Sequence, residues 1–208
     1  MLVIGNRNYS SWSLRAWLAL RHCGFEFDTH RLSMDTPAFT AQVRAFSGAA
    51  RVPVLVDHGT SIWDSLAIAE YAAERTGKGW PADPTARAIA RSAACEMHSG
   101  FADLRQAWPM DIRARRPGTT ASDSVTADLR RIDTLWVDCR TRFGAHGPWL
   151  FGQYSIADAF FAPVVCRIKT YGDPGLSAVS AAYCATTQDD PELAAWSVLA
   201  AQESEVLV

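Results

Sequence analysis

The segment from Arg51 to Tyr71, RVPVLVDHGTSIWDSLAIAEY, constrains the fold of this chain more than any other part of it. Its alternating β-branched residues favour a strand, and residues 57–60, DHGT, are typical of a turn that returns into a second short strand. Pro53 cannot donate a ladder hydrogen bond, so it belongs to the start or the edge of a strand, and its peptide bond can be cis. Asp64-Ser65 then precedes a run of helical composition. The segment therefore predicts a strand, a tight turn, a strand and a helix.

This arrangement also suggests a kind of ligand. An edge strand with a free backbone can pair with an extended peptide. A helix N-terminus offers unpaired N–H groups and a positive dipole, which together stabilise an anion. The segment is therefore suited to hold a small peptide that carries a carboxylate.

The same residues resemble the glutathione-binding half of the glutathione transferase superfamily. That family has a strand with Val-Pro, a hairpin, and then an acidic residue and Ser at a helix start, which here are Val52-Pro53 and Asp64-Ser65. Residues 8–15, NYSSWSLR, resemble the active-site loop and first helix of the serine-type classes, with a zeta-like pattern in which Ser10 precedes Arg15 by five positions. The resemblance covers roughly the whole chain and is strongest over residues 1–80.

The resemblance implies a thioredoxin-like α/β domain over residues 1–77, followed by an all-α helical domain over residues 85–208. The sequence pattern agrees with this division. A linker rich in Gly and Pro, GKGWPADP, separates the two parts. We expect strands at residues 2–4 and 25–30 and in the hairpin, and helices at residues 14–22, 35–44, 65–75, 85–107, 124–143, 156–170 and 191–201.

The helix expected at residues 156–170 is apolar on most faces, which predicts a buried central helix. Pro163 lies inside it and can kink it. Ser155 and Asp158 form the pattern of a capping box at its start. We assign Asp158 to stability rather than to chemistry.

The chemistry of glutathione requires a donor for its thiolate. A free thiol has a pKa near ~8.5, and lowering it by two units takes about 2.7 kcal/mol of preferential thiolate stabilisation. Ser10 and Ser11 lie where the first helix begins, and a hydroxyl donor together with the helix N-terminus can supply this. Ser10 matches the serine-type catalytic position, Ser11 is close enough to substitute, and Tyr9 is a third option. The alternative is that Ser11 or Ser13 only caps the helix.

By the same resemblance, Arg51 lies near the glycyl carboxylate of glutathione, and the backbone of Val52 pairs with its cysteinyl part. Asp64 faces the γ-glutamyl ammonium, and Ser65 binds the carboxylate at that end. The second-substrate site is expected between the domains, and its residues are Trp12, Trp108, Met110 and Arg113. Packing at a helix end is the other interpretation of the last three.

Composition excludes several other classes of protein. The net charge of −2 gives no electrostatic case for nucleic acid, and no apolar run approaches the ~20 residues of a membrane helix. Five scattered cysteines without a CxxC pair favour reduced thiols in a cytoplasmic protein and argue against a zinc site, and no other metal is expected.

The resulting expectation is a glutathione S-transferase that uses glutathione as co-substrate. It would add the glutathione thiolate to a small hydrophobic electrophile, and the resemblance implies a homodimer. Two alternatives stay open. One is a non-catalytic member that binds glutathione or apolar ligands, and the other is a zeta-like isomerase of the maleylacetoacetate isomerase type. Trp12 stands where the zeta class has Cys, which weakens the isomerase interpretation.

Overall fold

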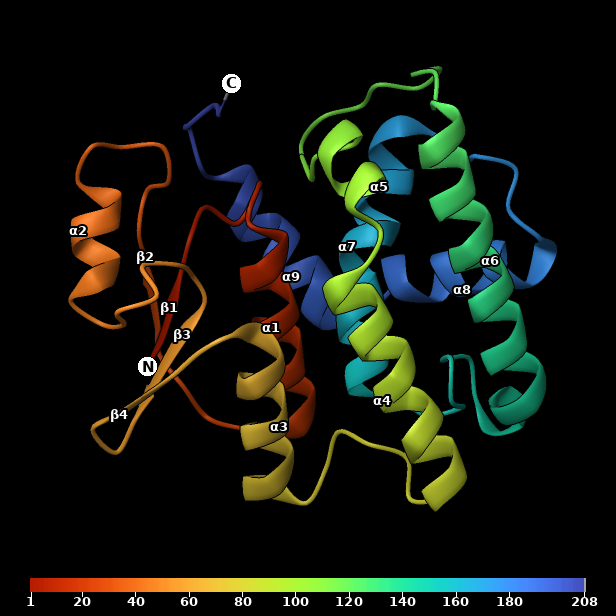
Figure 1. The fold of residues 1–208 in the computed structure, drawn as a ribbon, viewed down its shortest axis with the longest axis horizontal. Coiled ribbons are helices and arrows are strands. Elements are labelled where there is room, and N and C mark those ends of the chain that lie inside the picture. The colour runs from red at the N-terminus through yellow and green to blue at the C-terminus, as the bar shows by residue number, and fades with distance from the viewer. Residues whose placement is uncertain (208) are drawn as a thin grey trace.

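The computed structural model of the chain describes residues 1–207 and shows a small mixed sheet with three helices beside a larger group of helices (Figure 1). The sheet domain contains β1 (Leu2–Ile4), α1 (Ser11–Cys23), β2 (Thr29–Arg31), α2 (Phe39–Arg44), β3 (Val54–Asp57), β4 (Thr60–Ile62) and α3 (Ser65–Thr76). The helical domain contains α4 (Pro84–Ser99), α5 (Ala102–Ala107), α6 (Asp123–Phe143), the 3-10 helix η1 (Gly144–His146), α7 (Ile156–Tyr171), α8 (Ala178–Gln188) and α9 (Pro191–Ala201).

The sheet has the strand order β2-β1-β3-β4, in which β1 and β2 are parallel and the other neighbours are antiparallel. Helices α1 and α3 cover the face toward the helical domain, and α2 covers the other face (Figure 1). Successive side chains alternate between the two faces. Leu2 and Ile4 therefore join the main core, whereas Val3 packs with Val43 in a small cluster on the α2 side. The expected thioredoxin-like domain with a helical second domain is confirmed.

Several boundaries differ from the expectation. The predicted helix over residues 85–107 is two helices, because Phe101 takes a left-handed φ of 56° and Gly100 is extended between α4 and α5. A Cβ on Gly100 would lie 2.8 Å from the carbonyl oxygen of Glu96, so the break requires glycine. The second strand is shorter than predicted, α2 begins after Pro37 rather than before it, and α8 was not expected.

Helix α7 is the centre of the molecule, as its composition predicts. Of its residues only Lys169 is exposed, and the helix packs against α1, α4 and α8. Its start is fixed by Asp158, whose carboxylate accepts from the N–H of Ser155 at 2.8 Å, from the Ser155 hydroxyl at 2.9 Å and from the N–H of Leu150 at 3.1 Å. Burial raises the pKa of Asp158 to about 6, although these hydrogen bonds act to lower it.

The cysteines fit a packing role. Cys139, Cys166 and Cys184 are buried, and burial raises the pKa of each thiol, to about 12, 11 and 12 respectively. Within residues 1–207 no three His, Cys, Asp or Glu side chains gather in a way that would hold a metal ion. The helices described here also include none that combines the length and the apolar character needed to cross a membrane.

We predict that Asp158→Ala lowers the free energy of unfolding by about 3 kcal/mol, because it leaves two buried backbone N–H groups without an acceptor. Urea denaturation followed by circular dichroism measures this. Asp123→Ala is the matched control, since Asp123 lies exposed in the first turn of α6, where a carboxylate contributes only about 0.5 kcal/mol. Equal losses in the two variants would contradict the assignment.

Candidate functional site

Two adjoining cavities form one cleft where the sheet domain meets the helical domain. They have volumes of about 650 Å³ and 380 Å³ and share four lining residues, Trp12, Arg51, Val52 and Arg105. The larger, which we call the hairpin chamber, is also lined by Ala49, Pro53, Trp63, Asp64, Ser65 and His98. The smaller, which we call the loop chamber, is also lined by Tyr9, Ser10, Ser11, Met34, Phe39, Ala50, Pro109, Met110 and Arg167.

The hairpin chamber contains a polar group without a partner. Ser65 is the first residue of α3 and is 1% exposed, and its hydroxyl oxygen has no hydrogen bond to any residue from 1 to 207. Asp64 caps the helix, since its Oδ1 accepts from the N–H of Leu66 at 3.0 Å. A buried hydroxyl at a helix N-terminus is a suitable partner for a carboxylate.

Val52 lies before the strand rather than in it. β3 begins at Val54 and is flanked on both sides, by β1 and β4, so it is not the edge strand that the sequence suggested. In the described chain neither the N–H nor the C=O of Val52 has a backbone partner. The Val52–Pro53 peptide bond is cis. The backbone that is free to pair with a peptide is therefore the segment that leads into β3.

His98 is a site residue that the sequence analysis missed. It lies in the last turn of α4, and its Nε2 is 3.0 Å from Oδ2 of Asp64. Its ring meets the Trp12 ring edge-on, with the centroids 5.2 Å apart. No sequence spacing signals this contact, because it joins the ends of two helices from different domains.

The two candidate serines have different surroundings. Ser10 is the N-cap of α1, since its oxygen accepts from the N–H of Ser13 at 3.4 Å and its hydroxyl donates to the Ser13 hydroxyl at 2.7 Å. Ser11 is the first residue of the helix and is 7% exposed. Its hydroxyl has no hydrogen bond to residues 1–207 and lines the loop chamber. The Ser10 hydroxyl is therefore engaged in capping the helix, whereas the Ser11 hydroxyl is free to donate a hydrogen bond to a ligand.

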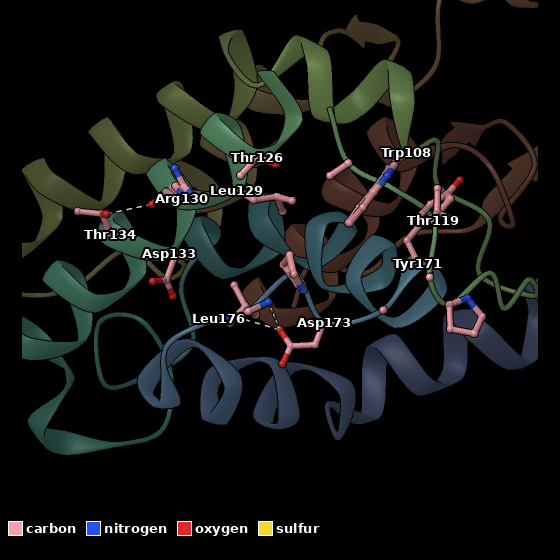
Figure 2. A pocket seen from close by; sticks show the side chains of 16 residues that line it. Trp108, Thr119, Thr126, Leu129, Arg130, Asp133, Thr134, Tyr171, Asp173 and Leu176 are labelled. Carbon is pink, nitrogen blue, oxygen red and sulfur yellow. Dashed lines mark hydrogen bonds between the residues drawn. The ribbon is translucent and has the colours of Figure 1, made fainter. Parts of the chain in front are cut away.

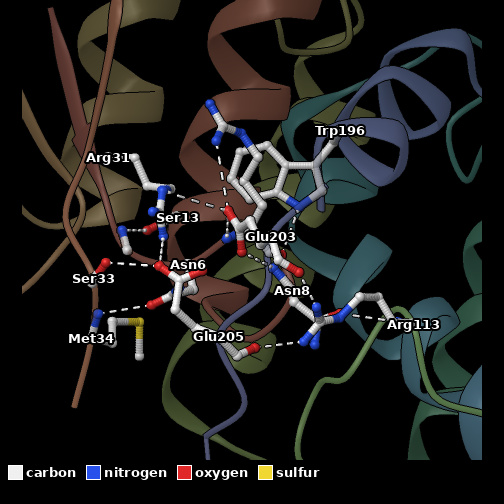
Figure 3. Close-up of polar contacts among 12 residues, drawn as sticks. Asn6, Asn8, Ser13, Arg31, Ser33, Met34, Arg113, Trp196, Glu203 and Glu205 are labelled. Atoms are coloured by element: carbon white, nitrogen blue, oxygen red, sulfur yellow. Dashed lines mark hydrogen bonds and ion pairs between the residues drawn. The ribbon is translucent and has the colours of Figure 1, made fainter. Parts of the chain in front are cut away.

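The loop that precedes α1 is held by the C-terminal tail, as Figure 3 shows. The Glu203 carboxylate accepts from the N–H of Arg7 at 2.9 Å and from the N–H of Asn8 at 3.3 Å. The indole of Trp196 donates to the carbonyl oxygen of Arg7 at 2.9 Å. These contacts fix the backbone immediately before Ser10 and Ser11.

Arg113 belongs to this same network and does not line the cleft where it was expected. Its guanidinium donates to the carbonyl oxygens of Glu203 and Glu205 and, at 3.1 Å, to the Tyr9 hydroxyl. The tail is also held by Arg31, whose hydrogen bond at 2.7 Å lowers the pKa of Glu205 to about 2. The reason for the difference is that the guanidinium is bound by tail residues that lie 90 and 92 positions away in the sequence.

Trp108 also lies elsewhere. It lines a separate cavity of about 840 Å³ inside the helical domain (Figure 2), where its ring stacks on Tyr171 with the centroids 5.0 Å apart. Trp108 is the C-cap of α5, the short helix that follows the break at Phe101. Of the four residues expected in the second-substrate site, Trp12 and Met110 line the cleft.

The loop chamber is strongly cationic. Its lining includes Arg51, Arg105 and Arg167 and no acidic residue. Arg15 lies beneath Trp12, with its guanidinium carbon 4.3 Å from the ring centroid, and Arg105 approaches the same ring at 5.2 Å. Burial, and then the charges of Arg167 and Arg105, hold the pKa of Arg15 well below its usual value. Burial lowers the pKa of Arg167 to about 10.

The sequence and the structure are both similar to known proteins. Residues 9–75 match the family described as "Glutathione S-transferase, N-terminal domain". A "Probable maleylacetoacetate isomerase" from Caenorhabditis elegans is 34% identical over 135 residues, which cover 62% of this chain and 62% of that relative.

Among solved structures, a glutathione transferase homologue from Burkholderia with bound glutathione has a TM-score of 0.73 at 20% identity, covering 97% of this chain and 98% of that one. A theta class glutathione S-transferase from Xanthomonas axonopodis with glutathione bound has a TM-score of 0.66 at 21% identity, covering 92% and 94%. A Tau class enzyme from mango has a TM-score of 0.70 at 18% identity, covering 96% of each chain. These similarities concern the fold.

Proposed function

We propose that the chain is a member of the glutathione transferase superfamily, that it binds glutathione and that it adds the glutathione thiolate to a small electrophile. Glutathione would occupy the hairpin chamber and the electrophile the loop chamber. The observation that carries the proposal is Ser65, a fully buried hydroxyl without a partner at the N-terminus of α3. This group lies beside the free backbone of Val52 in the same chamber.

Each part of glutathione has a matching group in this arrangement. The γ-glutamyl carboxylate accepts from Ser65 and from the N-terminal N–H groups of α3, and Asp64 faces the ammonium. The cysteinyl part pairs with the backbone of Val52. Arg51 also lines this chamber, and we assign its cation to the glycyl carboxylate.

The sulfur then lies toward the loop chamber and the start of α1. We assign thiolate stabilisation to the Ser11 hydroxyl together with the helix N-terminus, and Ser10 is the alternative donor. The thiol proton leaves to solvent, the thiolate attacks the electrophilic carbon, and the leaving group departs with its electron pair. Catalysis rests on positioning and on stabilising the thiolate, without a covalent enzyme intermediate.

A second candidate is a glutathione-dependent isomerase. The match to a probable maleylacetoacetate isomerase favours it, whereas Trp12 in place of the Cys of the zeta class argues against it. An assay with maleylacetoacetate separates the two activities. The remaining alternative is a non-catalytic member, and turnover of a generic aryl halide with glutathione would exclude it.

We predict that Ser65→Ala weakens glutathione binding at least about 10-fold, because a hydrogen bond to a charged group contributes about 1.5–3 kcal/mol. Isothermal titration calorimetry measures the affinity. Ser92→Ala, at an exposed serine on α4, should leave it unchanged. An unchanged affinity in Ser65→Ala would remove the carboxylate from this position.

We predict that Ser11→Ala lowers kcat about 100-fold, as the loss of a donor to a developing anion does in other enzymes. The pKa of the bound thiol, followed by ultraviolet absorbance against pH, should rise in this variant. Ser10→Ala should instead lower the free energy of unfolding by about 1 kcal/mol through loss of the cap. If only Ser10→Ala raises the thiol pKa, the role belongs to Ser10.

We also predict a homodimer, so that light scattering reports about twice the chain mass of 22.8 kDa. Tyr71 donates a hydrogen bond to Asp57, and Trp80 donates one to Glu70, so both rings have partners within the chain. Trp63, which lines the hairpin chamber, is instead 52% exposed and is available to a partner subunit. A stable interface should bury at least about 1,200 Å² in total. A monomer at every concentration would rule this out.

A further inference from the structure

We propose that the second substrate itself carries a carboxylate or a similar anionic group, bound by Arg105 and Arg167 in the loop chamber. This proposal narrows the expectation of a small hydrophobic electrophile. The inference rests on the proposed function, because it names the substrate class of the same cleft.

The charge of the loop chamber is the first observation. Three arginines line it without an acidic residue, although the adjoining hairpin chamber has Asp64. Arg51 and Arg105 line both chambers, whereas Arg167 lines the loop chamber alone, on the side of Pro109 and Met110. A bound glutathione in the hairpin chamber therefore does not account for Arg167.

The burial of Arg167 is the second observation. The residue is only 3% exposed. Its Nε donates to the carbonyl oxygen of Trp108 at 2.7 Å, and its NH1 donates to that of Pro163 at 3.1 Å. These partners orient the guanidinium but carry no net charge, and its NH2 has no hydrogen bond to residues 1–207. A buried charge without a counter-ion costs several kcal/mol, which an anion in the chamber would offset.

Arg105 also lacks a carboxylate partner, although it is less deeply buried than Arg167. Its Nε donates to the carbonyl oxygen of Phe101 at 3.3 Å, and its guanidinium lies over the Trp12 ring. Across the described chain, no carboxylate comes within 4.0 Å of Arg105, Arg167 or Arg15. The three cations therefore reinforce a positive potential that no protein group neutralises.

Arg15 strengthens this field without reaching a ligand. It is fully buried, its Nε donates to the carbonyl oxygen of Phe160 at 3.0 Å, and its two terminal nitrogens have no partner within residues 1–207. Trp12 lies between this charge and the cleft and interacts with it through its π face. An aromatic ring at position 12 thus allows a second cation to be held under the site.

The remaining walls describe the rest of the substrate. Met34, Phe39, Pro109 and Met110 give the loop chamber apolar surfaces beside its arginines. Its volume of about 380 Å³ limits the occupant to a small molecule. The substrate class is therefore a small electrophile with an apolar body and an anionic group at one end.

The experiment compares two conjugates that differ only in charge, S-(para-carboxybenzyl)glutathione and its methyl ester, by calorimetry on the full chain. The acid should bind about 10-fold more tightly than the ester, as a charge-assisted hydrogen bond predicts. Arg105→Gln should remove most of this preference, so that it weakens the acid more than the ester or glutathione itself. Arg130→Gln, at an exposed arginine of α6 outside the cleft, should leave both unchanged.

Equal affinities for the acid and the ester would overturn the proposal, and so would an Arg105→Gln variant that weakens glutathione and both conjugates by the same factor. Arg167→Lys keeps the charge but not the fork geometry, so it should lower the preference for the acid while circular dichroism stays native.

An activity measurement distinguishes a failure of this inference from a failure of the proposed function. It uses a chlorodinitrobenzoate and its methyl ester as electrophiles. If glutathione binds but neither electrophile reacts, the transferase proposal fails, and the conjugate pair still decides whether the anion site exists. If both electrophiles react equally well and the conjugates bind equally, the transferase proposal stands and the anion site is wrong.

Discussion

The packing of α1 between the two domains determines where every other part of the site lies. This helix is buried along most of its length, with α3 on one side and α7 on the other. Its N-terminus therefore opens into the junction between the domains, beside the N-terminus of α3. Two helix ends with partial positive charge face one cleft, which suits a ligand with a carboxylate and a thiolate.

The cleft is asymmetric in charge, and this asymmetry has a structural cause. On the hairpin side the carboxylate of the N-cap Asp64, which lies 3.0 Å from His98, offsets part of the positive field. On the loop side the helical domain contributes Arg105 and Arg167, whose hydrogen bonds run to backbone carbonyls rather than to carboxylates. Neutral acceptors hold a guanidinium in place but leave its charge uncompensated, so the field remains available to a ligand.

Local patterns predicted the parts of the fold that local chemistry determines. The hairpin over residues 54–62, the capping box of Asp158 and the buried character of α7 all follow from short-range periodicity and capping. The break at Phe101 was missed although Gly100 precedes it, because the apolar spacing of a helix continues across it and a left-handed φ at a phenylalanine carries no composition signal. The position of Arg113 depends on a tail that lies far away in the sequence. The pairing of His98 with Asp64 likewise joins separate domains.

The position of the loop before α1 depends on the C-terminal part of the chain. The N–H groups of Arg7 and Asn8 find their acceptor in Glu203, and the carbonyl oxygen of Arg7 accepts from Trp196 of α9. The sheet domain by itself would leave these backbone groups to water, and the loop that presents Ser10 and Ser11 would lose its anchor. The pKa of a bound thiol depends on where a hydroxyl and a helix end point, so a displacement of that loop would weaken thiolate stabilisation. Side chains near the C-terminus thus hold the backbone in front of Ser10 and Ser11 through hydrogen bonds that no local sequence motif signals.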